Sequence, residues 1–184
     1  MRHGESEWNV TGQHTGQTDI GLSDRGRREA EALGRGMAGR TFDFVMVSPM
    51  LRATDTCRLA GYLDGAEPCA DSVERSYGDF EGLTWPEIRA VAPEWTIWGP
   101  AAPNGESVED VAVRARRVLA RLEAVPGDAA LFAHGHFLRV LTALWLGLPP
   151  DHGRLFALGT ATVSVLGREN GVPVIRRWGV PPPL

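Results

Sequence analysis

The sequence contains little cysteine and no long apolar run. Among 184 residues there are two cysteines, Cys57 and Cys69, and their spacing matches no metal-binding pattern. This usage is typical of a reduced, cytoplasmic protein with two free thiols, although the sequence alone also allows a Cys57–Cys69 disulfide. No apolar stretch approaches the roughly 20 residues that span a bilayer, and the pattern of a secretory leader is also lacking. We therefore expect a cytoplasmic protein that does not bind membranes.

Basic residues are not in excess either. The chain carries 19 lysine and arginine residues against 23 aspartate and glutamate residues, which gives a formal net charge of −4. This balance argues against a protein that binds nucleic acid through bulk electrostatics. It leaves room for a small anionic ligand, because a local cluster of arginines and histidines is positive whatever the net charge of the whole chain.

Internal repeats and domain linkers are absent from the sequence as well. With 43% apolar and 23% charged residues, the composition is that of an ordinary globular protein. A chain of this length forms one domain and buries roughly 70% of its unfolded surface. We expect a single domain over residues 1–184, with a loose proline-rich tail at about 180–184.

Two short apolar runs indicate the class of fold. Phe42–Val47 and Ala129–Ala133 are nearly continuous, which is typical of parallel strands buried on both faces. Residues 64–83 and 96–106 are expected to be irregular. Cap and periodicity signals predict helices around the strands, at about 24–37, 49–63, 84–91, 107–122 and 136–146. This alternation predicts a three-layer α/β/α sandwich with a mostly parallel central sheet.

A hairpin is expected near the end of the chain. Glu169-Asn170-Gly171 is a turn signal, and it lies between apolar segments at 163–166 and 174–178. The two segments would pair as antiparallel strands.

The triplet Arg2-His3-Gly4 carries the strongest chemical signal. It places an imidazole that can attack phosphorus beside a cation that can hold phosphoryl oxygens, and Gly4 lets a ligand approach closely. Such a triplet also arises by chance in ordinary loops. His134, in turn, could be a satisfied structural histidine. The following Gly135 and the helix start favour an anion site, because free N–H groups and the helix dipole point at a ligand there.

Further motifs follow the triplet in order. They are Ser48-Pro49-Met50-Leu51-Arg52-Ala53, Glu74-Arg75-Ser76-Tyr77-Gly78-Asp79-Phe80-Glu81-Gly82 and Ala133-His134-Gly135-His136. With these motifs the chain resembles, from residue 2 to about residue 165, the histidine phosphatase superfamily, also called the phosphoglycerate-mutase-like or branch 1 group. The resemblance implies a phosphoglycerate-mutase-like fold and catalysis through a phosphohistidine, with no cofactor.

The resemblance also implies a phosphate pocket of four residues, Arg2, His3, Arg52 and His134, with His3 as the nucleophile. In the family the first triplet follows a central strand, so both histidines would lie beyond the carboxyl ends of parallel strands and meet there. Arg52 alone would be an ordinary solvated helix residue. In the family motif its planar fork of donors binds the phosphoryl group.

Glu74 matches the glutamate that serves the family as general acid and base. An alkoxide is a poor leaving group, so a carboxylic acid must protonate it, and the same carboxylate can then activate water. Taken alone, a carboxylate in an irregular loop is usually just solvated. Glu81 is a weaker alternative, because in the family it belongs to an adjacent structural turn.

A second layer of substrate-binding residues is implied by the same resemblance. Arg139 matches a residue that binds substrate in sugar-bisphosphatase members, although it could simply be an exposed helix residue. His14 is expected on the rim of the site, where it could contact the substrate body. The full set of expected substrate-binding residues is Asn9, His14, Thr15, Gly16, Gly135 and Arg139.

Three functions remain open at this point. A phosphatase of small phosphorylated metabolites fits best, with sugar-bisphosphatase and broad acid-phosphatase members as the most similar subgroup. A mutase is less favoured, because only residues 83–104 separate Gly82 from Gly105, and this stretch holds a single arginine, Arg89. A non-catalytic phospho-ligand binder is the third.

A zinc site at His134 and His136 is disfavoured, because further ligands are not evident. A homodimer is allowed but not required.

One feature departs from the family pattern. Several apolar residues should precede Arg2 and form a central strand, but Met1 alone stands there. A sheet that lacks a central strand leaves backbone N–H and C=O groups of the neighbouring strands without hydrogen-bond partners in the core. We hypothesise that residues upstream of Met1 are missing from the sequence, a point that N-terminal sequencing of the native protein would decide.

Overall fold

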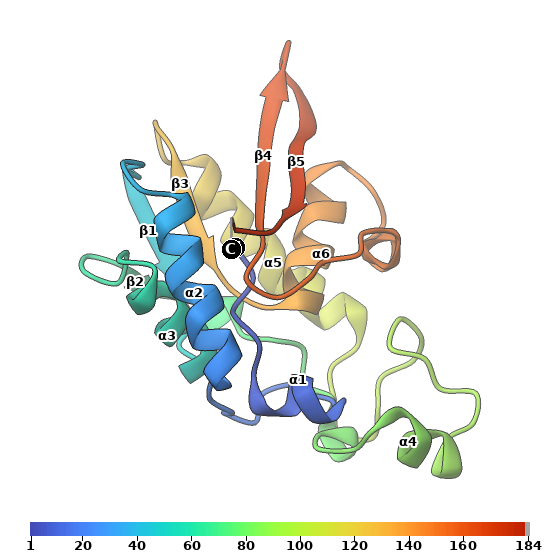
Figure 1. Ribbon diagram of the computed structural model, residues 1–184. Helices are drawn as coiled ribbons and strands as arrows, with labels where there is room; N and C mark the ends of the chain where they lie inside the picture. Colours follow the sequence, from blue (N-terminus) through green and yellow to red (C-terminus); the bar gives the residue numbers. More distant parts are fainter. Residues whose placement is uncertain (183–184) are drawn as a thin grey trace.

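The computed structural model describes residues 1–182, and three parallel strands form its central sheet (Figure 1). They are β1 (Phe44–Val47), β2 (Glu67–Pro68) and β3 (Ala129–Phe132), in the order β2-β1-β3. The register pairs Phe44 with Ala129 and Val47 with Phe132. The predicted parallel strands are confirmed, and β1 begins two residues later than expected.

Helices cover both faces of this sheet. On one face, α2 (Asp24–Gly36) and α3 (Leu51–Leu59) pack with Leu33, Ala53 and Cys57 against Val47 and Phe132. On the other face lie α5 (Val108–Glu123) and α6 (Gly135–Trp145). Successive strand residues point to opposite faces, so both faces must be apolar and covered. The predicted three-layer sandwich is confirmed.

The helix α3 is shorter than the sequence suggested. Pro49 lies outside it, because Met50 is the extended N-cap residue and the helix begins at Leu51. It ends at Leu59, and Gly61 with a φ of +83° then turns the chain away. The segment expected to be wholly irregular contains β2, a two-residue exposed edge strand too short to leave a pattern.

A small lobe beside the sheet carries α4 (Trp85–Val91), which a Thr84–Glu87 capping box starts as predicted (Figure 1). Its own core gathers Tyr77, Phe80, Ile88 and Ala102. The helix α1 was not predicted, and Ser6 and Asn9 form its capping box. The remaining short elements are α1 (Glu7–Thr11), η1 (Ala70–Ser72), η2 (Gly78–Phe80) and η3 (Pro150–Leu155).

The expected hairpin forms a separate antiparallel sheet of β4 (Val163–Glu169) and β5 (Val172–Val180) (Figure 1). Asn170 and Gly171 make its turn with φ values of 50° and 83°. Pro181 and Pro182 follow without regular structure, and the rest of the expected tail lies outside the described residues. Within residues 1–182, none of the helices has the length and apolar character needed to cross a membrane.

The first three residues lie between β3 and Thr162. The Arg2 amide donates to the Thr162 carbonyl, and the Ala133 amide donates to the Met1 carbonyl, both at about 3 Å. Beyond Met1 a cavity of about 530 Å³ separates β3 from the hairpin, with side chains of α2, α5 and α6 among its walls. Burial lowers the pKa of the Met1 amino group to about 5.

Candidate active site

His3 and His134 follow two extended segments that run side by side in the same direction. Arg2 pairs with Ala133 in a parallel bridge, and the His3 amide donates to the Ala133 carbonyl at 3.0 Å. The two imidazole rings lie with their centroids 5.2 Å apart. The expectation that these rings meet beyond the carboxyl end of β3 is confirmed.

The His3 ring is buried, and its Nδ1 lies 2.7 Å from the Gly4 carbonyl oxygen. A carbonyl oxygen only accepts, so we assign the ring proton to Nδ1, and Nε2 keeps its lone pair. Burial lowers the pKa of His3 well below its ordinary value, and the Arg2 and Arg52 guanidinium groups lower it further. At neutral pH the ring is therefore uncharged and has an unprotonated Nε2.

His134 is the N-cap residue of α6 and is fully buried. Its Nε2 lies 2.7 Å from the Ser48 hydroxyl, whereas its Nδ1 is buried without a hydrogen-bond partner. Burial lowers the pKa of His134 well below its ordinary value, and Arg52 contributes next. Ser48 is the first residue of the motif that contains Arg52, but nothing in that motif indicates that its hydroxyl contacts His134.

The partly buried Arg2 side chain lies against the start of α6. Its Nη1 donates to the Leu158 carbonyl, and its Nε is buried without a partner. Gly135 allows this approach, because a Cβ there would lie 3.2 Å from both Cζ and Nε of Arg2. The unpaired N–H beside His3 is a donor available to an anionic ligand.

Arg52 lies in the first turn of α3 and is fully buried. Its Nη2 donates to the Gly16 carbonyl at 2.7 Å and its Nη1 to the Thr18 carbonyl at 3.2 Å, while its Nε is buried without a partner. Glu81 holds the same loop by accepting from the Gln17 and Thr18 amides. A Cβ on Gly16 would lie 2.2 Å from Glu81 Oε1. The structure thus places Glu81 in a loop contact.

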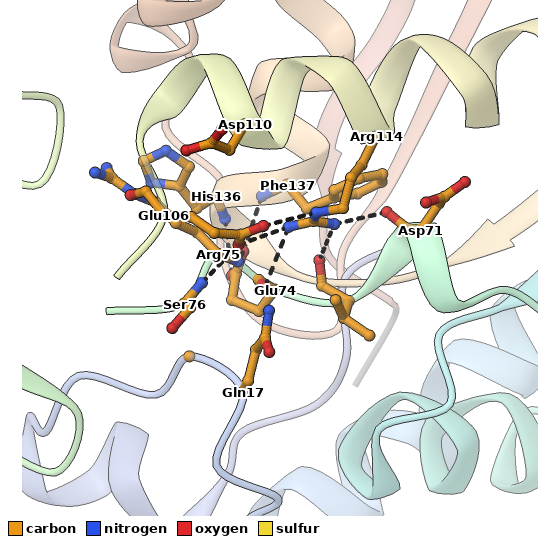
Figure 2. Close-up of polar contacts among 12 residues, drawn as sticks. Gln17, Asp71, Glu74, Arg75, Ser76, Glu106, Asp110, Arg114, His136 and Phe137 are labelled. Carbon is orange, nitrogen blue, oxygen red and sulfur yellow. Dashed lines mark hydrogen bonds and ion pairs between the residues drawn. The ribbon is translucent and has the colours of Figure 1, made fainter. Parts of the chain in front are cut away.

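Glu74 is buried with its carboxylate at the start of α6 (Figure 2). Its Oε2 accepts from the His136 amide, and its Oε1 accepts from the Phe137 and Arg75 amides, each at 2.9 Å. Two first-turn N–H groups of α6 therefore bind Glu74 and not a ligand, which corrects the prediction that they point at the ligand. A side-chain carboxylate satisfies helix N–H groups in the same way as a bound anion.

A cavity of about 340 Å³ lies between the two histidine-bearing segments and the small lobe that carries α4, and Arg52 and His134 are not among its lining residues. Its polar lining includes Arg2, His3 and Glu74. The other residues that line it are Trp8, Asn9, Gly12, Gln13, His14, Thr15, Tyr77, Trp85, Ile97, Gly135, His136, Arg139 and Leu158. The cavity is large enough for a small organic phosphate and combines a charged floor with aromatic walls.

His14 was expected on the rim of the site, and in the structure it is a buried residue of the cavity wall. Its Nδ1 lies 3.0 Å from the Leu83 carbonyl oxygen, and its ring centroid lies 4.8 Å from Trp85 and 5.5 Å from Tyr77. The sequence does not show that these rings contact one another, because His14, Tyr77 and Trp85 come from three different segments of the chain. Burial also lowers the pKa of His14, so the ring belongs to the aromatic wall.

Asn9 and Thr15, also expected to bind substrate, line the cavity and form hydrogen bonds within their own loop. Asn9 lines the cavity, but its Oδ1 accepts from the Ser6 amide in the α1 capping box. Thr15 lines the cavity, and its hydroxyl donates to the Gln13 carbonyl. Both residues therefore shape the loop that borders the site as well as its surface.

Arg139 lies on the far wall of the cavity rather than in open solvent. Its Nε donates to the Gly153 carbonyl and its Nη2 to the Arg154 carbonyl, and the guanidinium packs over the Trp98 ring. His136, which sequence reasoning considered only as a zinc ligand, stacks on the same ring at 4.0 Å. Its spacing from His134 gave no sign of this aromatic contact.

Among residues 1–182, no three histidine, cysteine, aspartate or glutamate side chains gather closely enough to hold a metal ion. Cys57 and Cys69 are both buried with free thiols, so the structure does not contain the disulfide that the sequence allowed.

Known proteins resemble the chain over nearly its full length. An acid phosphatase of Mycobacterium tuberculosis is 40% identical, with 100% of this chain and 94% of the relative covered. A sedoheptulose 1,7-bisphosphatase of Saccharomyces cerevisiae is 33% identical (80% and 66% covered), and a 2,3-bisphosphoglycerate-dependent phosphoglycerate mutase of Methylobacterium radiotolerans is 34% identical (96% and 87%). A solved structure from Mycobacterium tuberculosis superimposes with a TM-score of 0.90 at 38% identity, covering 98% of this chain and 95% of that one.

The family model of the histidine phosphatase superfamily (branch 1) matches residues 1–181. The match therefore includes the buried histidine pair, both arginines and Glu74. The chain belongs to branch 1 of the histidine phosphatase superfamily.

Proposed function

We propose that this phosphatase hydrolyses small phosphomonoesters, such as sugar phosphates or bisphosphates, through a phosphohistidine on His3. The observation that carries the proposal is the state of the His3 ring. Its Nδ1–H is committed to the Gly4 carbonyl, and burial beside two guanidinium groups keeps the ring neutral. An uncharged imidazole with a free Nε2 lone pair is the form that attacks phosphorus.

The substrate phosphoryl group would bind among Arg2, Arg52 and His134. Each offers a buried nitrogen without a partner, namely the Nε atoms of the two arginines and Nδ1 of His134. With the Ser48 hydroxyl donating to Nε2, the neutral His134 ring carries its proton on Nδ1. Three N–H donors would then stabilise the charge on the transferring oxygens.

The reaction requires two proton transfers, which we assign to Glu74. As His3 Nε2 forms a bond to phosphorus, the ester P–O bond breaks, and the leaving oxygen takes a proton from the carboxylic acid. In the second step the carboxylate removes a proton from water, the water oxygen bonds to phosphorus, and the P–N bond returns its electrons to Nε2. Oε2 has one amide partner and Oε1 has two, so we assign the transferred proton to Oε2.

The walls of the cavity favour a substrate with a ring or polyol body. Trp8, Trp85 and Tyr77 provide flat faces on which a sugar can lie. Arg139 commits two nitrogens to backbone carbonyls and would present Nη1 to a second phosphate or to hydroxyl groups. Asn9 would contact the substrate through its amide Nδ2, since its Oδ1 caps α1.

Metal independence and a cytoplasmic location belong to the same proposal. Two arginines and neutral histidines supply the charge and the nucleophile that a metal ion supplies in other phosphatases. The free, buried thiols suit a reducing compartment. We propose no nucleic-acid or membrane partner, and the homodimer that the sequence allows remains an open prediction.

A mutase is the second candidate, because mutases are among the relatives at 34% identity. Mutase chemistry needs a phosphohistidine that survives long enough to phosphorylate a bound product. The segment between Gly82 and Gly105 provides one arginine, Arg89, whose guanidinium packs over Trp85. The segment therefore provides few cationic side chains to bind a substrate carboxylate, and we rank the phosphatase first.

A panel of phosphorylated metabolites decides between these activities. Wild type should release phosphate from sugar phosphates in the presence of excess chelator, and it should isomerise 3-phosphoglycerate slowly or not at all. His3→Ala prepared in parallel serves as the blank. Rapid isomerisation with little release would support the mutase, and activity that is lost in chelator and restored by magnesium or zinc would overturn the metal-independent mechanism.

A further inference from the structure

A bidentate ion pair joins Arg114 of α5 to Glu106, just before that helix, and lies against the segment that carries Glu74 (Figure 2). Arg114 donates from Nε to Glu106 Oε1 and from Nη2 to Glu106 Oε2, both at 2.9 Å. The two side chains are 12% and 21% exposed, so water screens the pair far less than it screens a surface pair. The fork geometry fixes both the distance and the orientation of the guanidinium.

The same guanidinium binds the backbone around Glu74. Its Nη1 donates to the Asp71 and Val73 carbonyls at 2.6 and 3.0 Å, and its Nη2 reaches the Glu74 carbonyl at 3.4 Å. After η1 this segment is irregular, so its carbonyls lack partners from a helix or a sheet. Arg114 therefore provides hydrogen bonds that regular secondary structure would otherwise supply.

The opposite side of Glu74 is held through Glu106. Glu106 Oε2 accepts from the Ser76 amide at 2.9 Å, and the Glu106 carbonyl accepts from Arg75 Nε at 2.8 Å. Arg114 also packs over the Phe137 ring, and the Phe137 amide is one of the donors to the Glu74 carboxylate. One ion pair thus contacts the chain before Glu74, the chain after it and the helix that receives its carboxylate.

We propose that Arg114 is a positioning residue for the proton transfers of Glu74, acting through this ion pair. The inference rests on the proposed role of Glu74 as general acid and base. Proton transfer needs the carboxyl oxygen within hydrogen-bond reach of the leaving oxygen, and a small displacement of the segment would break that contact. A lysine in place of Arg114 keeps the charge but cannot reproduce the fork or reach all three carbonyls.

Arg117 offers a matched control on the same helix. It forms a bidentate pair with the Asp71 carboxylate, through Nε at 2.8 Å and Nη2 at 2.6 Å, but its side chain is 54% exposed. Arg117→Gln removes an ion pair to the same segment and leaves the backbone contacts of Arg114 in place. Exposed pairs of this kind add little, so activity should stay within about threefold of wild type on any substrate.

The test compares two leaving groups in Arg114→Lys. Hydrolysis of p-nitrophenyl phosphate barely needs a proton donor, whereas hydrolysis of a sugar phosphate does. We expect kcat/KM for the sugar phosphate to fall at least about tenfold, with kcat/KM for p-nitrophenyl phosphate within about threefold of wild type. This ratio reports the step in which the leaving group departs and Glu74 acts as an acid, whereas the later attack of water is common to both substrates. Glu106→Gln should show the same selective loss to a smaller degree, and it carries the test if Arg114→Lys does not fold.

Glu74→Gln distinguishes a failure of the positioning role of Arg114 from a failure of the acid–base role of Glu74. If Glu74→Gln lowers kcat/KM selectively for the sugar phosphate but Arg114→Lys and Glu106→Gln lower kcat/KM equally for both substrates, or for neither, the positioning role is overturned while the function of Glu74 stands. If Glu74→Gln shows no selectivity for the leaving group, the acid–base assignment itself fails, and the positioning role falls with it. Selective losses in all three variants, and none in Arg117→Gln, support the proposal.

Discussion

Two clusters of buried charge lie side by side in this protein and are built in opposite ways. The phosphate pocket (Arg2, His3, Arg52 and His134) leaves N–H groups of both arginines and one nitrogen of His134 without partners. The brace (Glu74, Glu106 and Arg114) engages both oxygens of each carboxylate and all three nitrogens of its guanidinium.

The difference shows which cluster is a receptor and which is a support. Buried donors without partners cost free energy, so a fold retains them where a ligand supplies the missing acceptors. The pocket also concentrates positive charge, which suits an anion. In the brace, Glu106 and Arg114 satisfy each other and the backbone around Glu74 without a ligand, and Glu74 is the one member that would also contact the substrate. The predictions below test this contrast by perturbing each cluster in turn.

The largest effect should come from removing the nucleophile. His3→Ala takes away the protein atom that we propose forms a bond to phosphorus, so kcat should fall on the order of 10⁴-fold or more. His152→Ala, which changes a partly exposed histidine that pairs with Asp151, is the control and should retain activity. Turnover by His3→Ala within about tenfold of wild type would exclude the phosphohistidine.

The second prediction concerns stability and pH. His3, His134 and His136 have pKa values well below their ordinary range, chiefly through burial, whereas in the unfolded chain they titrate normally. Below about pH 6.5 the unfolded state therefore binds more protons, and the free energy of unfolding falls as the pH falls. Below pH 6.5 these three protons, at about 1.4 kcal/mol each, contribute up to about 4 kcal/mol per pH unit, and the Met1 amino group and His14, whose pKa values burial also lowers, add in the same direction.

Urea unfolding between pH 7 and pH 5.5 measures this slope. His134→Asn should reduce the slope by the contribution of one proton, up to about 1.4 kcal/mol per pH unit. Arg114→Lys, which alters the brace and no histidine, should leave the slope unchanged. Stability that stays flat or rises as the pH falls would show that these histidines are not neutral in the folded protein.

The third effect should come from the pocket cations. Arg52→Lys keeps the charge but loses the fork that binds the Gly16 and Thr18 carbonyls, so kcat/KM should fall by about 10²-fold. Inorganic phosphate should raise the Tm of wild type and of Arg114→Lys, but much less that of Arg52→Lys. Arg58→Lys, at an exposed position of α3, is the control. Equal stabilisation of all variants by phosphate would place the anion site elsewhere.

The smallest effect concerns the far wall of the cavity. Arg139→Ala should raise KM for a sugar bisphosphate about tenfold, close to 1.4 kcal/mol, and leave p-nitrophenyl phosphate nearly unchanged. The reason is that Arg139 lies in the cavity lining with one nitrogen uncommitted to the backbone carbonyls. The same KM change for both substrates would make Arg139 a support for Gly153 and Trp98 instead of a specificity residue.

Much of the fold could be predicted because its signals are local. The caps at Ser23, Thr84 and Ser107 placed three helices, and the apolar runs before Ser48 and His134 placed two strands. The edge strand β2 could not be predicted, since two exposed residues carry no pattern.

The candidate site, too, could be predicted only where its signals are local. The motifs predicted that the histidine pair and both arginines lie close together, because parallel strands end at one edge of a sheet. They could not show that Glu74 binds the start of α6 or that Ser48 holds His134. They also missed the burial of His14 among aromatic rings. These contacts join residues far apart in the sequence, and only their packing in three dimensions defines them.

The most direct test of the account is to trap the covalent intermediate. Wild type mixed briefly with ³²P-labelled substrate and quenched in alkali should carry label that is stable in alkali and released by acid, and peptide mapping should place it on His3. The same label should be absent from His3→Ala and present in Arg114→Lys. Label that survives acid, maps to another residue or is present in His3→Ala would contradict a phosphohistidine on His3.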